Sequence, residues 1–554
     1  MIIEVKKELS SGWEKIQIAE GSKIEDIYKL YKEELPYVVL CANRNNVIED
    51  LNHPVMDGDR IELMDGRHKA ANLIYQYTLS MIYIKAVNDV LGKVKVDMEN
   101  TLNKGVFTEI RSKKPVTEAQ VRAIEDRMRQ IVEADLPITK ELVSRERGLE
   151  IMKEEGMVEK LQLLSNHLDV KDIKFYSLDG YREFFYGYMA PSTGYIQVFE
   201  LKKYRRGVLL RFPESSNPDR LPEYIDQTKL YEAFGEQSSW AKTQGIYYVT
   251  DLNKKIDEGR ERDLILLSEA LHEKRIAEIA EMIKKEKKRI ILIAGPSSSG
   301  KTTFAKRLCV QMYVAGLKPI YMGTDDYFVE REETPVDENG EKNFEDLEAI
   351  DIELFNEHMN GLLRGEKVDI PTFDFMTGHK VFGNRIIQAT DNQPIVIEGI
   401  HALNEKLTEQ IPKDVKFKIY ISPLTQLTID EHNKVSSTDQ RMLRRIVRDN
   451  LYRGHDAQST IRDWPKVRAG EHKNIFPFTN EADVLFNSVH IYEISVLKKY
   501  AEPLLKAIKE DEPEFPEAVR MLKFLRFFRT IENDSLIVNN SIIREFIGGS
   551  VFVK

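Results

Sequence analysis

The first 65 residues alternate apolar and polar positions in short runs around one amphipathic stretch. The runs are MIIEVKKEL, WEKIQIAEG, YVVLCANRNNVIEDL and VMDGDRIELM, and the amphipathic stretch is SKIEDIYKLYKEEL. Period-two alternation is typical of half-buried strands, and apolar residues three to four apart are typical of a helix. The pattern predicts a small β-grasp domain over residues 1–65. Ser22 is expected to cap its helix, with Glu25 completing a capping box.

The stretch from residue 66 to residue 213 changes from a helical to a strand-like pattern. Apolar residues recur at helical spacing in NLIYQYTLSMIYIKAVNDVLG and again from Thr117 to about Ala134, whereas the end, GYMAPSTGYIQVFELKKYRRGVLLRFP, is β-rich. This predicts an α+β domain. Residues 214–262 contain charged turns and are interpreted as a connecting segment, after which a long helix opens the last domain, residues 263–554.

The last domain carries one apolar run, RIILIA, followed by four more. These are KPIYMGTDDYF, PIVIEGIHAL, VKFKIYI and ADVLFN, separated by helical or irregular stretches. Short apolar strands that alternate with helices are typical of a parallel sheet in an α/β protein. The sequence therefore predicts an α/β domain with a parallel sheet.

The run RIILIA leads into GPSSSGKT, with the spacing G-x-x-x-x-G-K-T, and then into the amphipathic stretch TFAKRLCVQMY. Gly295 and Gly300 allow the backbone to curl so that its N–H groups line an anionic cavity, and the following helix adds the positive end of its dipole. Lys301 is expected to reach the β- and γ-phosphates of a nucleoside triphosphate, and the Thr302 hydroxyl to join the shell of Mg²⁺. A simple connecting turn is the alternative, which the Lys-Thr pair disfavours. The expected nucleotide contacts are Gly295, Pro296, Ser297, Ser298, Ser299, Gly300, Lys301, Thr302 and Thr303.

Three acidic residues follow or end apolar runs of the predicted sheet: Asp325, Asp326 and Glu398. Ligands of parallel sheets bind beyond the carboxyl ends of the strands, so these acids are expected where the phosphates lie. Each of these acids, taken alone, could be an ordinary loop residue. Beside a phosphate loop, however, Mg²⁺ ligation or proton acceptance is favoured.

Length, charge and cysteine content narrow the functional classes. The 554 residues exceed what one core normally serves, so two to four domains are expected. Asp and Glu (91) outnumber Lys and Arg (81), and the formal charge of −10 disfavours indiscriminate nucleic-acid binding. Cys41 and Cys309 are too few for a disulfide framework and fit a reducing compartment. No apolar run approaches the roughly twenty residues that span a bilayer, and the start lacks a signal-peptide core, so a cytoplasmic location is expected.

Residues 289–487 resemble the uridine kinase and phosphoribulokinase family. The motifs that carry the resemblance are GPSSSGKTT, TDDYF, NFEDLEAID, PTFDFMTGHK, IVIEGIHAL and RRIVRDNLYRG, in the same order as in the family. The resemblance implies a P-loop kinase that uses ATP and Mg²⁺. It implies that Asp325 is the general base on a ribose 5′-hydroxyl and that Glu398, with Thr302 and Asp325, organises Mg²⁺.

The same resemblance implies a nucleoside pocket. Glu345 stands where the family has an Asp that holds the ribose hydroxyls, and Phe373 and Phe375 map to the aromatic pocket for the base. His379 falls one residue after the family's His, and Tyr327 in TDDYF joins the expected substrate contacts. The alternative for the two phenylalanines is packing in the core, because their i, i+2 spacing also fits one face of a strand.

Arg441, Arg444, Arg445 and Arg448 fall at i, i+3, i+4 and i+7, which places four guanidinium groups along one stripe of a helix. Like charges so arranged repel unless anions lie between them. The resemblance implies a lid helix in which Arg445, Arg448 and Arg453 close over the transferred phosphoryl group. A solvated basic face or ion pairs with the abundant acids are the alternative.

The front of the chain is similar to threonyl-tRNA synthetases. Residues 1–65 resemble their TGS domain, and residues 66–213 resemble the editing domain that follows it. The editing motifs Cys-x-Gly-Pro-His and His-x-x-x-His align with Phe185, Met189, Tyr77 and Met81. Because these side chains replace the thiolate and imidazole groups that bind metals and carry protons, the fold is expected to be kept and the hydrolysis lost.

Together these features predict a cytoplasmic kinase that phosphorylates the 5′-hydroxyl of uridine or cytidine. One alternative is a kinase of another nucleoside or of a sugar, as in phosphoribulokinases. A second is a regulatory ATPase whose front modules bind RNA. The sequence leaves RNA binding by the front modules and assembly into homo-oligomers open, and it assigns no chemistry to residues 488–554.

Overall fold

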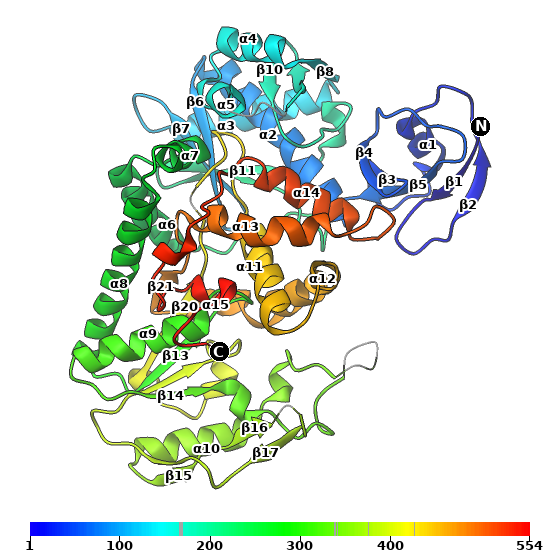
Figure 1. Ribbon diagram of the computed structural model, residues 1–554. Helices are drawn as coiled ribbons and strands as arrows, with labels where there is room; N and C mark the ends of the chain where they lie inside the picture. Colours follow the sequence, from blue (N-terminus) through cyan, green and yellow to red (C-terminus); the bar gives the residue numbers. More distant parts are fainter. Residues whose placement is uncertain (166–169, 337–339, 341, 375, 426, 554) are drawn as a thin grey trace.

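The computed structural model describes residues 1–165, 170–336, 340, 342–374, 376–425 and 427–553. Figure 1 shows a small front domain beside a second domain, with the last domain below them. The C-terminal helices lie between these parts, near the centre of the molecule. No helix among the described residues is both long enough and apolar enough to cross a bilayer.

The front domain is a five-stranded mixed sheet with one helix across it, in the strand order β2-β1-β5-β3-β4. Its first and last strands pair in parallel and its other pairs are antiparallel, which is the predicted β-grasp arrangement. Ile3, Ile27 and Ile61 are among its fully buried core residues. The elements are β1 (Ile2–Lys6), β2 (Glu14–Gln17), α1 (Ile24–Tyr31), β3 (Val39–Arg44), β4 (Val47–Asp50) and β5 (Arg60–Asp65).

The predicted cap of α1 is wrong by one residue. Lys23 is the N-cap, and its backbone N–H donates a hydrogen bond to Asp26 Oδ2 (2.9 Å). The Ser22 hydroxyl instead donates to the carbonyl of Ala19 (2.9 Å). Ser22 therefore closes the preceding turn and does not cap the helix.

The second domain contains two antiparallel sheets, ordered β10-β9-β8 and β11-β12-β7-β6, with helices packed on them. The predicted helix from Thr117 to Ala134 is α3, and the Gln120 N–H donates to the Thr117 hydroxyl at its start (3.3 Å). The elements are α2 (Lys69–Leu91), β6 (Lys95–Leu102), β7 (Gly105–Arg111), α3 (Glu118–Glu133), β8 (Ile138–Ser144), α4 (Arg145–Glu155), α5 (Val158–Ser165), β9 (Asp172–Leu178), β10 (Tyr181–Phe184), β11 (Glu200–Tyr204) and β12 (Gly207–Arg211).

The connecting segment forms helices that bridge the domains. Helices α6 (Thr228–Gln244) and α7 (Val249–Asp257) precede the long helix α8 (Glu261–Lys285), and α6 contacts both β6 and strand β21 (Val484–Asn487) of the last domain. These helices run along one side of the molecule in Figure 1. Residues 214–262 therefore pack against both neighbouring domains.

The last domain is built on a parallel five-stranded sheet, ordered β14-β19-β13-β20-β21, which confirms the predicted α/β fold. Alternate residues of β13 point to opposite faces: Ile291 packs with α8 and α9, and Leu292 packs with α10. Strand β13 is Ile290–Ala294, β14 Ile320–Gly323, β19 Ile395–Glu398 and β20 Lys416–Ser422; helix α9 is Lys301–Val314 and α10 Ile352–Leu363.

The described part of this domain also contains two two-stranded antiparallel sheets and the α-helices α11 to α15. The hairpin of β16 and β17 is flanked in the chain by β15 and β18, which pair with each other. The elements are β15 (Lys367–Asp369), β16 (Thr372–Asp374), β17 (His379–Val381), β18 (Ile386–Gln388), α11 (Ser437–Tyr452), α12 (Ala457–Asn474), α13 (Glu493–Lys506), α14 (Phe515–Leu525) and α15 (Arg544–Ile547). Helix α11 lies in the middle of the molecule (Figure 1), and Arg441, Arg444 and Leu443 on it are buried.

A buried polar network joins the second domain to the loop before α11. The Lys160 ammonium is fully buried, and it donates to Glu183 Oε1 (2.7 Å) and lies 2.9 Å from His432 Nδ1. The Met98 N–H donates to the Glu431 carbonyl (2.8 Å). The second domain is thereby attached directly to the segment that leads into α11.

Candidate active site

The phosphate loop joins β13 to α9, and glycine is required at both ends of it. A Cβ atom at Gly295 would lie 2.1 Å from the Ile421 carbonyl oxygen. Gly300 has a φ of +86°, in the left-handed region that glycine tolerates, and is the N-cap of α9. The loop therefore packs tightly on β20 and leads directly into the N-terminus of α9, the end of a helix that binds anions.

Polar groups in this loop fit an anionic ligand. The Lys301 ammonium donates to the carbonyls of Gly295 (2.9 Å) and Pro296 (3.4 Å), and burial lowers its pKa. The hydroxyls of Ser298 and Ser299 are buried and have no hydrogen-bond partner among the described residues. Phosphate oxygens would supply the acceptors that these two hydroxyls lack, and a further acceptor for the Lys301 ammonium.

The hydroxyl of Thr302 contacts the carboxylate of Glu398, the last residue of β19. It donates to Glu398 Oε1 (2.8 Å), and the Tyr321 hydroxyl donates to the same oxygen (2.6 Å). Hydroxyl and carboxylate oxygens are the ligands that Mg²⁺ prefers, and Mg²⁺ in phosphotransferases is usually held by one or two carboxylates with substrate phosphates. The donors present fit this ion. Tyr321 could not be singled out from the sequence, because its contact with Glu398 depends on the pairing of β14 with the neighbouring strand β19.

The two aspartates after β14 have different partners. Asp326 Oδ2 accepts a hydrogen bond from Arg385 (2.7 Å). Asp325 is exposed at the mouth of the site, but the protein around it limits its hydration, and this, with the Glu398 carboxylate, raises its pKa to about 6. A carboxylate whose pKa lies near the working pH is suited to accept a proton.

Glu345 faces the phosphate loop, whereas its neighbour does not. A Cβ atom at Gly470 would lie 2.4 Å from Glu345 Oε2, so this carboxylate lies directly against α12. Glu345 is exposed, but the protein around its carboxylate limits hydration, and this, with Glu471, raises its pKa, while Arg445 and Lys301 lower it. Asp346 instead pairs with Lys473 (2.8 Å), so only the first carboxylate of this pair faces the loop.

Two of the expected substrate contacts lie in the hydrophobic core. Tyr327 is fully buried, and its hydroxyl lies 3.3 Å from His358 Nδ1. Phe373 is 5% exposed and packs edge-on against Phe328, with ring centroids 5.5 Å apart. Apolar packing, the alternative weighed from the spacing, explains the position of Phe373. Tyr327, the other expected substrate contact, lies in the same apolar cluster.

The remaining two pocket predictions fall on the hairpin region. His379, at the start of β17, is exposed, and its Nδ1 lies 2.6 Å from Glu330 Oε2. This contact ties β17 to the segment that follows Asp325 and lowers the pKa of Glu330. Phe375 lies outside the described residues.

The four arginines of α11 divide into two pairs with different roles. Arg441 and Arg444 are buried in ion pairs with Glu471 and Glu493, and they also donate to the carbonyls of Ser297 (3.2 Å) and Ser298 (3.1 Å). The ion-pair alternative therefore describes these two. The predicted lid helix, α11, therefore packs directly on the phosphate loop through these hydrogen bonds.

The arginines that the resemblance selects surround one carboxylate. Asp449 lies 3.2 Å from Arg445, 2.7 Å from Arg448 and 3.6 Å from Arg453. Arg445 also donates to the Ser297 hydroxyl (2.8 Å). Arg445 and Arg448 also lower the pKa of Glu345 and Glu545, respectively, so this cluster brings positive charge to the acidic groups close to the loop.

Two glutamates of the site had no sequence signal. Glu471 of α12 accepts the Ser297 N–H (2.9 Å), and Glu545 of α15 accepts both the N–H (3.2 Å) and the hydroxyl (2.7 Å) of Thr303. Both follow Lys301 by more than 150 residues. Only the folded arrangement of α12 and α15 brings them to the loop.

The four residues aligned with the editing motifs lie together inside the second domain. Met81, Phe185 and Met189 are buried, and the rings of Tyr77 and Phe185 lie 6.1 Å apart. Apolar bulk occupies this position, and Phe185 also stacks on His432 at the junction with the last domain. These side chains contribute to packing between domains.

Comparisons with known proteins place both halves of the chain. The model of the phosphoribulokinase / uridine kinase family matches residues 290–495. A uridine kinase of Staphylococcus haemolyticus is 30% identical over 197 residues, 35% of this chain and 86% of that protein. A uridine kinase of Halalkalibacterium halodurans is 27% identical over 197 residues, 84% of its length.

The front half is similar to part of another enzyme. A threonine–tRNA ligase of Desulforamulus reducens is 23% identical over 185 residues, which are 33% of this chain and 29% of the ligase. Among solved structures, a possible uridine kinase from Bacillus stearothermophilus is 21% identical, with a TM-score of 0.26, covering 38% of this chain and 97% of that one. Through its last domain, with a family match over residues 290–495 and a 30% identical relative covered over 86% of its length, the chain belongs to the phosphoribulokinase / uridine kinase family.

Proposed function

We propose that this protein transfers the γ-phosphoryl group of ATP to the 5′-hydroxyl of a pyrimidine nucleoside, with uridine or cytidine as the leading acceptor. The observation that carries the proposal is the position of Asp325, a carboxylate with a pKa of about 6 that faces Glu398 and Lys301 at the mouth of the phosphate loop. The relatives named as uridine kinases support the acceptor.

Each side chain of the site has a role in this reaction. Lys301 and the loop N–H groups bind the phosphates, and Asp325 accepts the proton of the attacking hydroxyl. Arg445, Arg448 and Arg453 stabilise charge on the transferred group, and Glu345 orients the ribose. Thr302, Glu398 and Asp325 would hold Mg²⁺, which neutralises phosphate charge when it is bound.

A panel of acceptors with labelled ATP tests this function. We expect transfer to uridine and cytidine, with the label at the 5′ position, and little transfer to ribulose 5-phosphate or free ribose. Because Tyr327 and Phe373 are buried in the core, we expect them to contribute little to base recognition, which favours modest discrimination between bases. Transfer to a non-nucleoside sugar alone would refute the proposed acceptor. ATP hydrolysis unaffected by any nucleoside would instead favour the regulatory ATPase.

The pKa of Asp325 predicts the pH dependence of the reaction. Only the ionised carboxylate accepts a proton, so kcat/KM is expected to fall about tenfold per pH unit below pH ~6 and to level off above it. Steady-state rates between pH 5 and 8 measure this fall of kcat/KM on the acid side. Recovery of activity when the enzyme is returned to pH 7.5 is the control for stability. A profile that is flat down to pH 5 would exclude a base with this pKa.

A further inference from the structure

The C-terminal segment ends on the phosphate loop. Glu545 accepts the N–H and the hydroxyl of Thr303, in the first turn of α9, and a Cβ atom at Gly300 would lie 2.5 Å from Ile542. The Lys306 ammonium, one turn further along α9, donates to the Phe552 carbonyl (2.6 Å). Residues 541–552 therefore cover the start of the helix that presents the phosphate-binding N–H groups.

A carboxylate in this position conflicts with a bound phosphate. The first-turn N–H groups of a helix are its anion-binding donors, and Glu545 already uses the one at Thr303. Burial, with the nearby Glu398, raises the pKa of Glu545, while Arg448 lowers it. A nucleotide phosphate and an ionised Glu545 would compete for the same donor and would repel each other.

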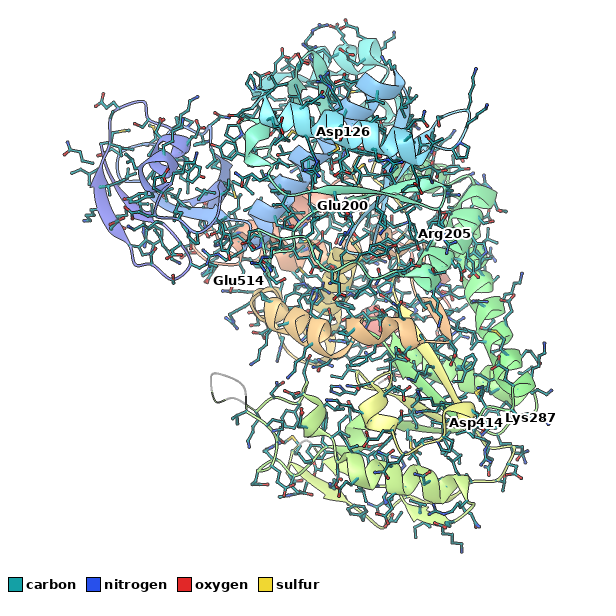
Figure 2. The ribbon with its side chains drawn as sticks, turned by 180° about the vertical axis from the view of Figure 1, so that it is seen from behind. Asp126, Glu200, Arg205, Lys287, Asp414 and Glu514 are labelled. Atoms are coloured by element: carbon teal, nitrogen blue, oxygen red, sulfur yellow. The ribbon has the colours of Figure 1, made fainter. Side chains whose placement is uncertain are left out.

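Before it reaches the phosphate loop, the C-terminal segment contacts the front domain. The Asn46 side-chain amide, in the turn between β3 and β4, donates to the carbonyls of Glu510 (2.7 Å) and Glu512 (2.6 Å). The labelled Glu514, just before α14, lies where the C-terminal segment meets the front domain (Figure 2).

Further along the chain, the C-terminal segment also contacts the second domain and the connecting helices. Lys69 pairs with Glu517 (2.7 Å), and the Tyr186 and Phe527 rings lie 4.4 Å apart. Asn253 of α7 donates to the Phe527 carbonyl (2.8 Å). Residues 510–552 thus form one continuous segment from the front domain to the phosphate loop.

We infer that residues 510–552 act as an autoinhibitory latch: Glu545 holds the start of α9 in place of a nucleotide phosphate, and the contact with Asn46 helps to keep the latch closed. The inference rests on the proposed function, because it assigns regulation to the same nucleotide site. Nucleotide binding must withdraw Glu545 from Thr303, and the front domains contribute to the cost of that withdrawal.

Calorimetric titration of the full-length protein with a non-hydrolysable ATP analogue and Mg²⁺ tests the latch. Glu545→Gln keeps the size and an acceptor oxygen but removes the charge, and we expect it to bind the analogue about tenfold more tightly than the wild type. Asn46 has a φ of +66°, so Asn46→Gly removes the amide without backbone strain, and we expect a smaller gain of about two- to threefold. Glu532→Gln, on an exposed side chain of the same segment, is the matched control and should bind like the wild type.

Hydrogen exchange of the wild type gives a second readout that needs no variant. The peptide over residues 541–547 should exchange faster when the analogue is bound. Equal affinity of wild type and Glu545→Gln, weaker binding by that variant, or unchanged exchange would each overturn the latch while leaving the kinase intact. A gain with Glu545→Gln but none with Asn46→Gly would overturn the contribution of the front domain. Absence of binding by every form would refute the nucleotide site itself, and the latch with it.

Discussion

Turnover of the Asp325→Asn variant is expected to be roughly a hundredfold or more below that of the wild type, the usual scale for loss of a general base. Asparagine preserves the size of the side chain but cannot take the proton of the attacking hydroxyl. The phosphates are bound by the loop and Lys301, so affinity for ATP should change little. Single-turnover rates and analogue binding, measured on the same preparation, separate the two effects.

The adjacent acid supplies the comparison. Asp326 pairs with Arg385, so Asp326→Asn should retain far more activity than Asp325→Asn. The Asp326 charge helps to raise the pKa of Asp325, so this variant should keep an acid limb in its pH profile, shifted to a lower pH than in the wild type. Near-normal turnover of Asp325→Asn would remove this residue from its role. An equal loss in the two variants would indicate that the pair acts through the local structure and not through proton transfer.

Much of the fold follows from local patterns. The phosphate loop was predictable because Gly295, Gly300 and Lys301 belong to one short turn that is contiguous in the sequence. The five parallel strands were predictable because each is a short apolar run. The rule that parallel strands share a carboxyl edge also places Asp325 and Glu398 near that loop. In the structure, Glu398 raises the pKa of Asp325, so these side chains lie close enough to interact.

Contacts that depend on tertiary structure were not predictable. Glu471 and Glu545 come from α12 and α15, and ordinary surface glutamates have the same local sequence signal. Tyr321 has its role only because β14 pairs with β19. The reverse holds for Phe373 and Tyr327: the family resemblance favoured a binding role, but the apolar cluster around them buries both rings.

The helix α11 shows how one pattern can serve two purposes. A stripe of arginines at i, i+3, i+4 and i+7 predicts a basic face, but it does not reveal which side meets protein. Arg444 meets Glu493 in the core, whereas Arg445 and Arg448 remain beside Asp449 near the loop. Burial on one side of the helix therefore decides between structural support and phosphate binding.

Replacing Glu493 with Ala is expected to lower the free energy of unfolding by about 3–5 kcal/mol, because the Arg444 charge would remain buried without its partner. Both side chains of this pair are fully buried, with Arg444 Nη2 2.7 Å from Glu493 Oε2. Arg444 also donates to the Ser488 carbonyl (2.9 Å), which cannot neutralise its charge. Urea unfolding followed by tryptophan fluorescence measures the change, since Trp464 is buried in the same cluster as α11 and α13.

The partly exposed pair Lys506–Glu502 on the same helix, α13, is the matched control for this effect. Solvent screens that pair, so Glu502→Ala should change the free energy of unfolding by less than about 1 kcal/mol. The double variant Arg444→Met with Glu493→Leu removes both charges and replaces them with apolar groups, so it should recover much of the loss. A loss below about 1 kcal/mol in Glu493→Ala would contradict the burial of the Arg444–Glu493 ion pair, because an unpaired buried cation lowers the free energy of unfolding by more than that. If the double variant were as unstable as Glu493→Ala, the loss would come from packing around Ser298 and Ser488 and not from the unpaired charge.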